Sequence, residues 1–136
     1  REGGDITLVG YGTQINALLE AADRLEGEGI SAEVVKLNAI TPSPRGVLFE
    51  SVKKTGMLLL AEESMDHNCV GRRVTADLSL HGITTRKITL LNLGDKIPPQ
   101  VTVEQLRRMN GLDVESIVQR VKEVAGHEKA FGRSSG

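Results

Sequence analysis

Short apolar runs alternate along the chain with segments whose apolar residues recur every three or four positions. The runs are rich in Val, Ile and Leu, as is typical of buried strands, and we expect strands at 6–9, 32–37, 57–61 and 86–93. The periodic segments predict helices, which we place at 14–26, 44–55, 70–80, 103–109 and 114–124. The chain therefore alternates strand and helix and ends on two helices.

Residues that begin and end helices support these boundaries. Thr13 is expected to cap the first helix, and Ser43 with Pro44 supplies an N-cap and a proline at the first helical position of the second. The sequence Thr-Val-Glu-Gln at 102–105 has the pattern of a capping box, and Asp113 is expected to cap the last helix. Glycines after each periodic segment are suited to ending it.

Alternation of this kind predicts an α/β domain. We expect three layers, α/β/α, around a mostly parallel (mixed) sheet of five strands or fewer. No linker or repeat divides the sequence, so residues 1–126 are predicted to form one domain. Residues 127–136 are polar and rich in small side chains, and we interpret them as a tail outside the domain.

Composition narrows the classes of function. The 136 residues carry a net charge of −1, and only 2% of them are aromatic. A platform that stacks nucleic-acid bases needs exposed rings, so we expect no nucleic-acid partner. No apolar run approaches the roughly 20 residues that cross a bilayer, so we expect no membrane partner. The single cysteine, Cys69, leaves no internal disulfide, and the chain begins without Met, which suggests a piece of a larger protein.

The turn Gly10-Tyr11-Gly12 joins the first strand to the first helix, where a glycine turn can hold a phosphate. A dinucleotide-binding motif would require a third glycine near position 15, which is Ile15 here, and a phosphate-loop lysine is also missing. We therefore favour a tight strand-to-helix turn over a phosphate site.

Glu62, Glu63 and Ser64 follow the most apolar strand directly. Ligands of open α/β sheets bind at the carboxyl ends of strands, so these residues are candidates for a substrate edge or an interface. His67 lies just beyond them, and His is the side chain that titrates near neutral pH. Adjacent strand residues point to opposite faces, so we do not expect Glu62 and Glu63 to act as a catalytic pair. The three histidines lack the spacing of metal ligands, and we predict no metal site.

Four segments resemble the C-terminal domain of the transketolase superfamily of thiamine-diphosphate enzymes. They are Ile-Thr-Leu-Val-Gly-Tyr-Gly-Thr at 6–13, Val-Val-Lys-Leu-Asn-Ala-Ile-Thr-Pro at 34–42, Leu-Leu-Leu-Ala-Glu-Glu-Ser at 58–64, and the stretch 91–117 with Gly-Leu-Asp at 111–113. The last of these is most similar to 1-deoxy-D-xylulose-5-phosphate synthase. Asn38 stands where that synthase has an arginine implicated in holding substrate phosphate, and is a further candidate for the substrate edge.

This resemblance implies a role within a larger cytoplasmic enzyme. Thiamine diphosphate and magnesium are implied for the whole enzyme, held by preceding domains, and no catalytic residue is expected in this chain. Its implied partners are those domains and a second copy in a homodimer. We expect the chain alone to be inactive and to support the dimer and the substrate channel.

Two other interpretations remain open from the sequence. The first is the C-terminal part of a transketolase subunit or of a 2-oxo acid dehydrogenase E1 β-subunit. The second is a stand-alone α/β ligand-binding module of the flavodoxin or receiver type. A receiver needs acidic residues just after its first strand, and flavin binding favours aromatic stacking, so the composition argues against this module.

Overall fold

A computed structural model describes residues 1–37, 45–63, 70–94 and 101–126, without the side chains of Arg45 and Val103. Four strands alternate with helices, and two helices and a π-helical turn follow. The elements are β1 (Ile6–Gly10), α1 (Gln14–Glu26), β2 (Ala32–Lys36), α2 (Arg45–Thr55), β3 (Met57–Ala61), α3 (Val70–Leu80), β4 (Lys87–Leu91), α4 (Val103–Met109), α5 (Val114–Val121) and η2 (Lys122–Gly126).

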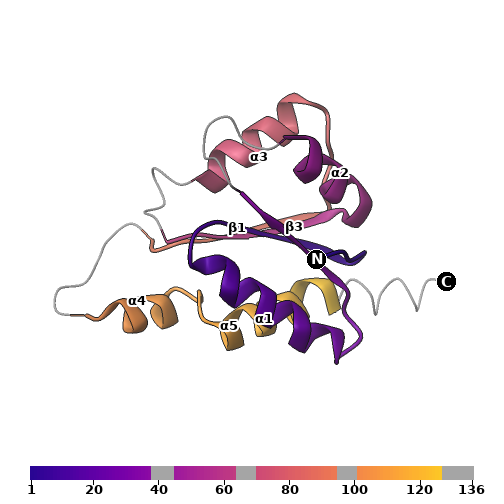
Figure 1. Ribbon diagram of the computed structural model, residues 1–136. Coiled ribbons are helices and arrows are strands. Elements are labelled where there is room, and N and C mark those ends of the chain that lie inside the picture. The colour runs from indigo at the N-terminus through magenta and orange to yellow at the C-terminus, as the bar shows by residue number, and fades with distance from the viewer. Residues whose placement is uncertain (38–44, 64–69, 95–100, 127–136) are drawn as a thin grey trace.

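The strands form one sheet in the order β2-β1-β3-β4, and every described pairing is parallel. Helices α2 and α3 cover one face, and α1 and α5 cover the other (Figure 1). The predicted α/β/α architecture is confirmed, with four described strands in the sheet. A parallel sheet covered on both faces requires apolar side chains on both, and β1 and β3 are buried along their whole length.

Alternation along each strand divides the core into two clusters. Ile6, Leu8 and Leu59 face α1 and α5, where they pack with apolar residues of both helices. Val9 and Leu58 face the opposite way, toward α2 and α3. The chain has only three Phe, Tyr or Trp residues, and aliphatic side chains fill most of both clusters, as the composition predicts.

Most predicted ends of elements are confirmed. Thr102 and Gln105 form the capping box of α4, and the Asp113 carboxylate accepts a hydrogen bond from Ser116 N at the start of α5. The last predicted strand is shorter than expected, ending at Leu91 rather than at 93, and the last helix changes to a π-turn after Val121. The predicted cap by Ser43 and Pro44 lies outside the described residues.

The prediction for Thr13 is wrong. Thr13 occupies the N-cap position of α1, but its backbone is helical (φ −69°, ψ −21°) and its side chain makes no capping hydrogen bond. A capping side chain folds back from an extended backbone, and that geometry is absent here. Its hydroxyl donates instead to Glu63 Oε1 at 3.4 Å.

The first five residues run antiparallel along the outer side of β2. Val34 N donates to the Arg1 carbonyl at 3.0 Å, and Asp5 N donates to the Ser31 carbonyl at 2.8 Å. A Cβ at Gly3 would lie 2.4 Å from the Ala32 carbonyl carbon, so only glycine permits this approach. The segment covers one edge of the sheet, which explains why β2 is buried along most of its length.

Glu33 on β2 is a buried carboxylate with several donors around it. Burial acts to raise its pKa, but hydrogen bonds from Lys54, Ser51 and Gly3 N outweigh burial and hold the pKa below its ordinary value. Lys54 Nζ lies 2.5 Å from Glu33 Oε1. The ionised form is therefore favoured by folding.

This shift predicts an acid-sensitive contribution to stability. A lowered folded-state pKa means that the unfolded chain binds the proton more readily, so the contribution is complete above the unfolded value of about 4.3. It is lost as the pH falls through the lowered folded pKa. Urea unfolding measured between about pH 7 and pH 3 should show a shallower acid loss in Glu33→Gln than in the original chain. Equal slopes in the two proteins would contradict the assignment.

Two buried threonines offer a matched test of polar burial. The Thr7 hydroxyl on β1 contacts Ser51 Oγ at 2.7 Å and Thr55 Oγ1 at 2.8 Å. The Thr89 hydroxyl on β4 is buried and has no hydrogen-bond partner among the described residues. Valine has the same shape without the hydroxyl, so Thr7→Val should destabilise the fold by about 1 kcal/mol and Thr89→Val should stabilise it by a similar amount. Urea unfolding followed by circular dichroism measures both, and the same sign for both would refute this account.

Candidate functional site

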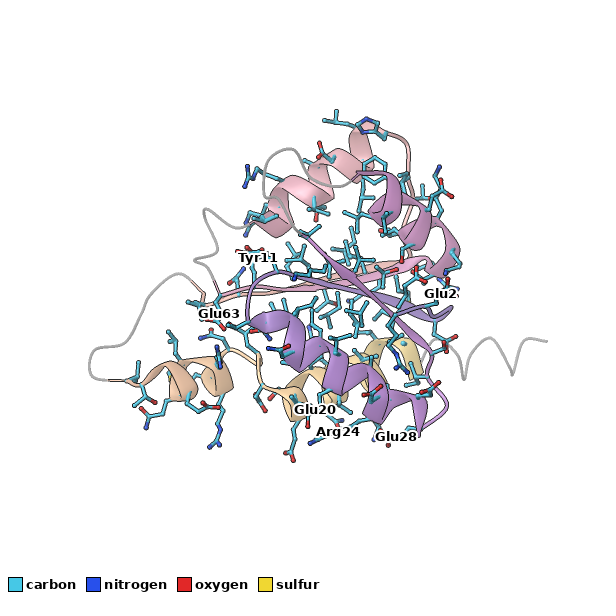
Figure 2. All side chains as sticks on the ribbon, viewed as in Figure 1. Glu2, Tyr11, Glu20, Arg24, Glu28 and Glu63 are labelled. Carbon is cyan, nitrogen blue, oxygen red and sulfur yellow. The ribbon has the colours of Figure 1, made fainter. Side chains whose placement is uncertain are left out.

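The strand order changes direction between β1 and β3, because the chain adds β2 on one side of β1 and then β3 on the other. Ligands of open α/β sheets bind outside the carboxyl ends of strands at such a switch point. Tyr11 and Thr13 follow β1 here, and Glu62 and Glu63 follow β3. Tyr11 and Glu63 lie at the same end of the sheet, and Glu2 lies at the other end (Figure 2). This end is therefore the candidate site.

Glu62 is buried, with 1% of its surface exposed. Its carboxylate accepts hydrogen bonds from Val70 N at 2.8 Å and Gly71 N at 2.7 Å, the first two residues of α3. The Tyr11 hydroxyl donates to the same carboxylate at 3.1 Å. A negative charge is favoured at a helix N-terminus, where backbone N–H groups lack helical partners. Glu62 therefore joins β3 to the start of α3 and to the turn after β1.

Gly71 makes this contact possible. A Cβ at this position would lie 2.9 Å from Leu90 Cδ2 and 3.1 Å from Glu62 Oε2. A larger residue here would require the Leu90 side chain and the capping carboxylate to shift. Glycine therefore allows α3 to pack closely against the sheet.

Glu63 pairs with a residue from the far end of the sequence. Arg107 of α4 donates to Glu63 Oε1 through Nε at 2.9 Å and through Nη2 at 2.5 Å, and Nη2 also reaches Thr13 Oγ1 at 3.4 Å. Arg107 and Glu63 are 44 residues apart, so no local pattern marks the pair. Arg107 is the residue of this site that sequence reasoning missed.

The candidates predicted from the sequence are only partly described. Glu62 and Glu63 follow β3 at its carboxyl end as expected, each with its own partners. Asn38, Ser64 and His67 lie outside the described residues, as does Cys69. The candidate site is thus built from Tyr11, Thr13, Glu62, Glu63 and Arg107.

The glycine turn after β1 has a packing role. A Cβ at Gly10 would lie 2.6 Å from Leu18 Cδ1 of α1 and 3.4 Å from the Ala61 carbonyl oxygen. Gly12 adopts φ +61°, which glycine tolerates without steric cost. Both requirements fit the tight strand-to-helix turn favoured by the sequence.

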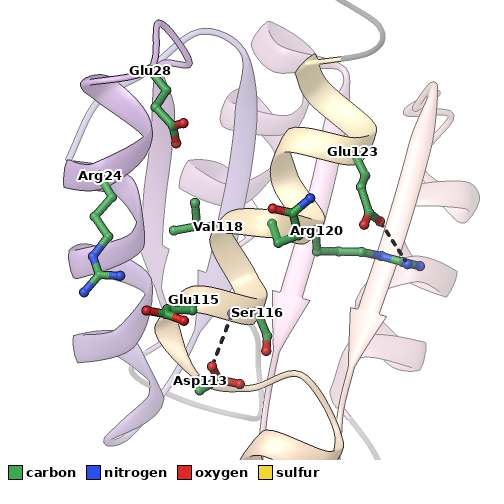
Figure 3. Close-up of a pocket in the computed structure, with 9 residues that line it drawn as sticks. Arg24, Glu28, Asp113, Glu115, Ser116, Val118, Arg120 and Glu123 are labelled. Atoms are coloured by element: carbon green, nitrogen blue, oxygen red, sulfur yellow. Dashed lines mark hydrogen bonds and ion pairs between the residues drawn. The ribbon is translucent and has the colours of Figure 1, made fainter.

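A groove of about 720 Å³ lies elsewhere, between α1 and the helix formed by α5 and η2. Figure 3 shows Val118 between the helices, with charged side chains around it. Arg24 pairs with Glu20, Glu28 with Lys122, and Arg120 with Glu123. Four of the charged lining residues are thus paired within the chain, whereas Asp113 Oδ1 is buried and has no hydrogen-bond partner among the described residues.

The described residues do not fit a thiamine-diphosphate site. Among them, no group of three or more His, Cys, Asp or Glu side chains is placed to hold a metal ion. The acidic groups at the switch point are hydrogen-bonded to α3 and Arg107.

None of the helices that the structure describes has the length and apolar character of a membrane-spanning helix.

Comparison with known proteins gives one matching family. Residues 1–117 match the family described as "Transketolase, C-terminal domain". The chain is 31% identical over 125 residues to the pyruvate dehydrogenase E1 component subunit beta of Bacillus subtilis (strain 168), covering 90% of this chain and 38% of that protein. It is 34% identical over 127 residues to the 2-oxoisovalerate dehydrogenase subunit beta of the same organism, covering 90% and 39%.

Solved structures agree with this match. A chain described as "Split gene transketolase, inactive beta4 tetramer" gives a TM-score of 0.78 at 31% identity, covering 93% of this chain and 41% of that one. A 2-oxoglutarate:ferredoxin oxidoreductase from Magnetococcus marinus gives a TM-score of 0.62 at 19% identity, a likeness of fold alone. The chain spans about two fifths of the length of these two curated relatives.

Proposed function

The chain belongs to the transketolase C-terminal domain family, and on this premise we propose that it is the C-terminal domain of a 2-oxo acid dehydrogenase E1 β-type subunit. The supporting observation is the identity of 31% and 34% to two dehydrogenase β-subunits, each across 90% of this chain. The sequence motifs alone favour 1-deoxy-D-xylulose-5-phosphate synthase, with a transketolase or E1 β-subunit as the alternative. The similarity to dehydrogenase β-subunits supports this alternative better.

In this proposal the chain has a structural role in the enzyme and contributes no catalytic residue. Thiamine diphosphate provides a nucleophilic carbon and an electron sink for 2-oxo acid chemistry when it is bound. In this proposal the cofactor and its magnesium are held by other parts of a cytoplasmic enzyme, as the family resemblance implies. The domain then packs against the cofactor-binding parts and supports assembly with a second copy.

A transketolase subunit is the second candidate. The supporting observation is the split-gene transketolase chain, which matches at 31% identity with a TM-score of 0.78. Identity at this level is equal to that of the pyruvate dehydrogenase β-subunit, so sequence likeness alone does not separate these two functions.

Activity of the full-length protein separates them. The protein is purified with the chains bound to it and is supplied with thiamine diphosphate and Mg²⁺. We expect pyruvate or a branched 2-oxo acid to reduce an artificial electron acceptor and to acylate an added lipoyl domain. Ketol transfer between sugar phosphates, without lipoyl acylation, would favour the transketolase subunit. Carboligation of pyruvate with glyceraldehyde 3-phosphate would restore the synthase interpretation.

A further inference from the structure

Helix α4 is set apart from the other helices on its side of the sheet (Figure 1). Among its described side chains only Leu106 is buried, with 8% of its surface exposed, and Met109 is 60% exposed. A seven-residue helix with one buried apolar anchor gains little from packing. Its position must therefore depend on its polar contacts.

Those polar contacts meet at the switch point. Arg107 holds Glu63 through two nitrogens and reaches Thr13 through one of them. Glu63 follows β3 and Thr13 follows β1, so a single guanidinium fastens α4 to both central strands. The Arg107 and Glu63 side chains are each 30% exposed, so solvent and salt reach the pair.

The contacts at the two ends of α4 do not involve the Arg107–Glu63 ion pair. At its start, Thr102 Oγ1 accepts from Gln105 N at 3.1 Å and Gln105 Oε1 accepts from Thr102 N at 2.9 Å. At its end, Gly111 has φ +73°, and the carbonyl of the buried Leu112 accepts from Gln14 Nε2 at 2.8 Å. The helix start is thus satisfied by its own residues, and Leu112 is a fixed point just beyond a glycine turn.

We propose that α4 is a strap, fastened to the switch point by the Arg107–Glu63 ion pair. It is able to lift when the hydrogen bond from Leu112 N to the Arg107 carbonyl, which closes the Gly111 turn at 2.8 Å, opens while the rest of the domain stays folded. Thr13 and Glu63 are already exposed, so lifting would not uncover them but would release the Thr13 hydroxyl and the Glu63 carboxylate from Arg107, at the end of the sheet where open α/β sheets receive ligands. Because the fastening is a partly exposed ion pair, ionic strength sets how often the strap is lifted. The inference does not depend on the proposed function.

Hydrogen–deuterium exchange of the full chain, read by mass spectrometry, tests the strap. In Arg107→Ala we expect amides of residues 103–109 to exchange up to about fivefold faster than in the original chain at low salt. Glu63→Ala should give the same acceleration, and the double variant no more than either. Amides of β1 and β3 should not change, since the sheet stays folded.

Arg108→Ala is the matched control, because Arg108 is the neighbouring exposed arginine of the same helix. The α4 amides of Arg108→Ala should exchange at the same rate as those of the original chain. Raising NaCl to 1 M should accelerate α4 exchange in the original chain and leave Arg107→Ala unchanged. Unchanged α4 exchange in Arg107→Ala, or equal acceleration in Arg108→Ala, would overturn the strap. Faster exchange throughout the sheet would overturn it as well, because it would mean global destabilisation.

Discussion

Glu62→Ala is expected to destabilise the domain by about 3 kcal/mol. The substitution removes the acceptor of two backbone N–H groups at the start of α3 and of the Tyr11 hydroxyl. Buried donors left without an acceptor lose their hydrogen bonds without regaining those to water. The chain has no Trp, so urea unfolding is best followed by circular dichroism.

Two further variants separate charge from shape. Glu62→Gln keeps the shape and one acceptor oxygen, but its amide NH₂ would face a backbone N–H of α3, so we expect an intermediate loss of stability. Glu63→Ala removes the neighbouring carboxylate, which is in a partly exposed pair, and should cost less than about 1 kcal/mol. A similar loss for Glu62→Ala and Glu63→Ala would show that burial and helix capping do not distinguish the two residues.

The fold could be predicted from the sequence because its signals are local. The five-residue apolar run at 57–61 has the composition of a strand covered on both faces. Asp113 caps the start of α5 by accepting a hydrogen bond from Ser116 N, only three residues further along the chain. Thr13 shows where local reasoning fails. Its residue type favours capping, but its hydroxyl instead donates to Glu63 and accepts from Arg107, and both partners are distant in sequence.

The candidate site was predictable only in outline. The rule about strand ends placed Glu62 and Glu63 at the carboxyl edge, and the structure locates both there. Their partners depend on the strand order and on the position of α4 near the carboxyl end of the sheet, which no periodicity encodes. The sequence therefore identifies the carboxylates, while Arg107 and the capping of α3 by Glu62 are seen only in the folded structure.

The stability of the domain is expected to depend strongly on the residues at its C-terminal boundary. The family match ends at residue 117, but the described helix continues through Val121 and η2. Val121 is fully buried and Ala125 is 4% exposed, and both belong to the cluster beneath α1. Figure 3 shows this segment packed along α1. A chain cut after Ile117 would lose these contacts and uncover the apolar residues beneath them.

Cutting after Ile117 is therefore expected to destabilise the domain by about 5 kcal/mol, since each fully buried aliphatic side chain contributes about 2 kcal/mol and several partly buried ones add to it. A small domain has total stability of about that size, so the shortened chain should be largely unfolded by circular dichroism. A chain cut after Gly126 is the control, and it should unfold at the urea concentration of the original, as the predicted boundary at 126 requires. Equal stability of both shortened chains would place the end of the folding unit at the family match and make the burial of Val121 incidental.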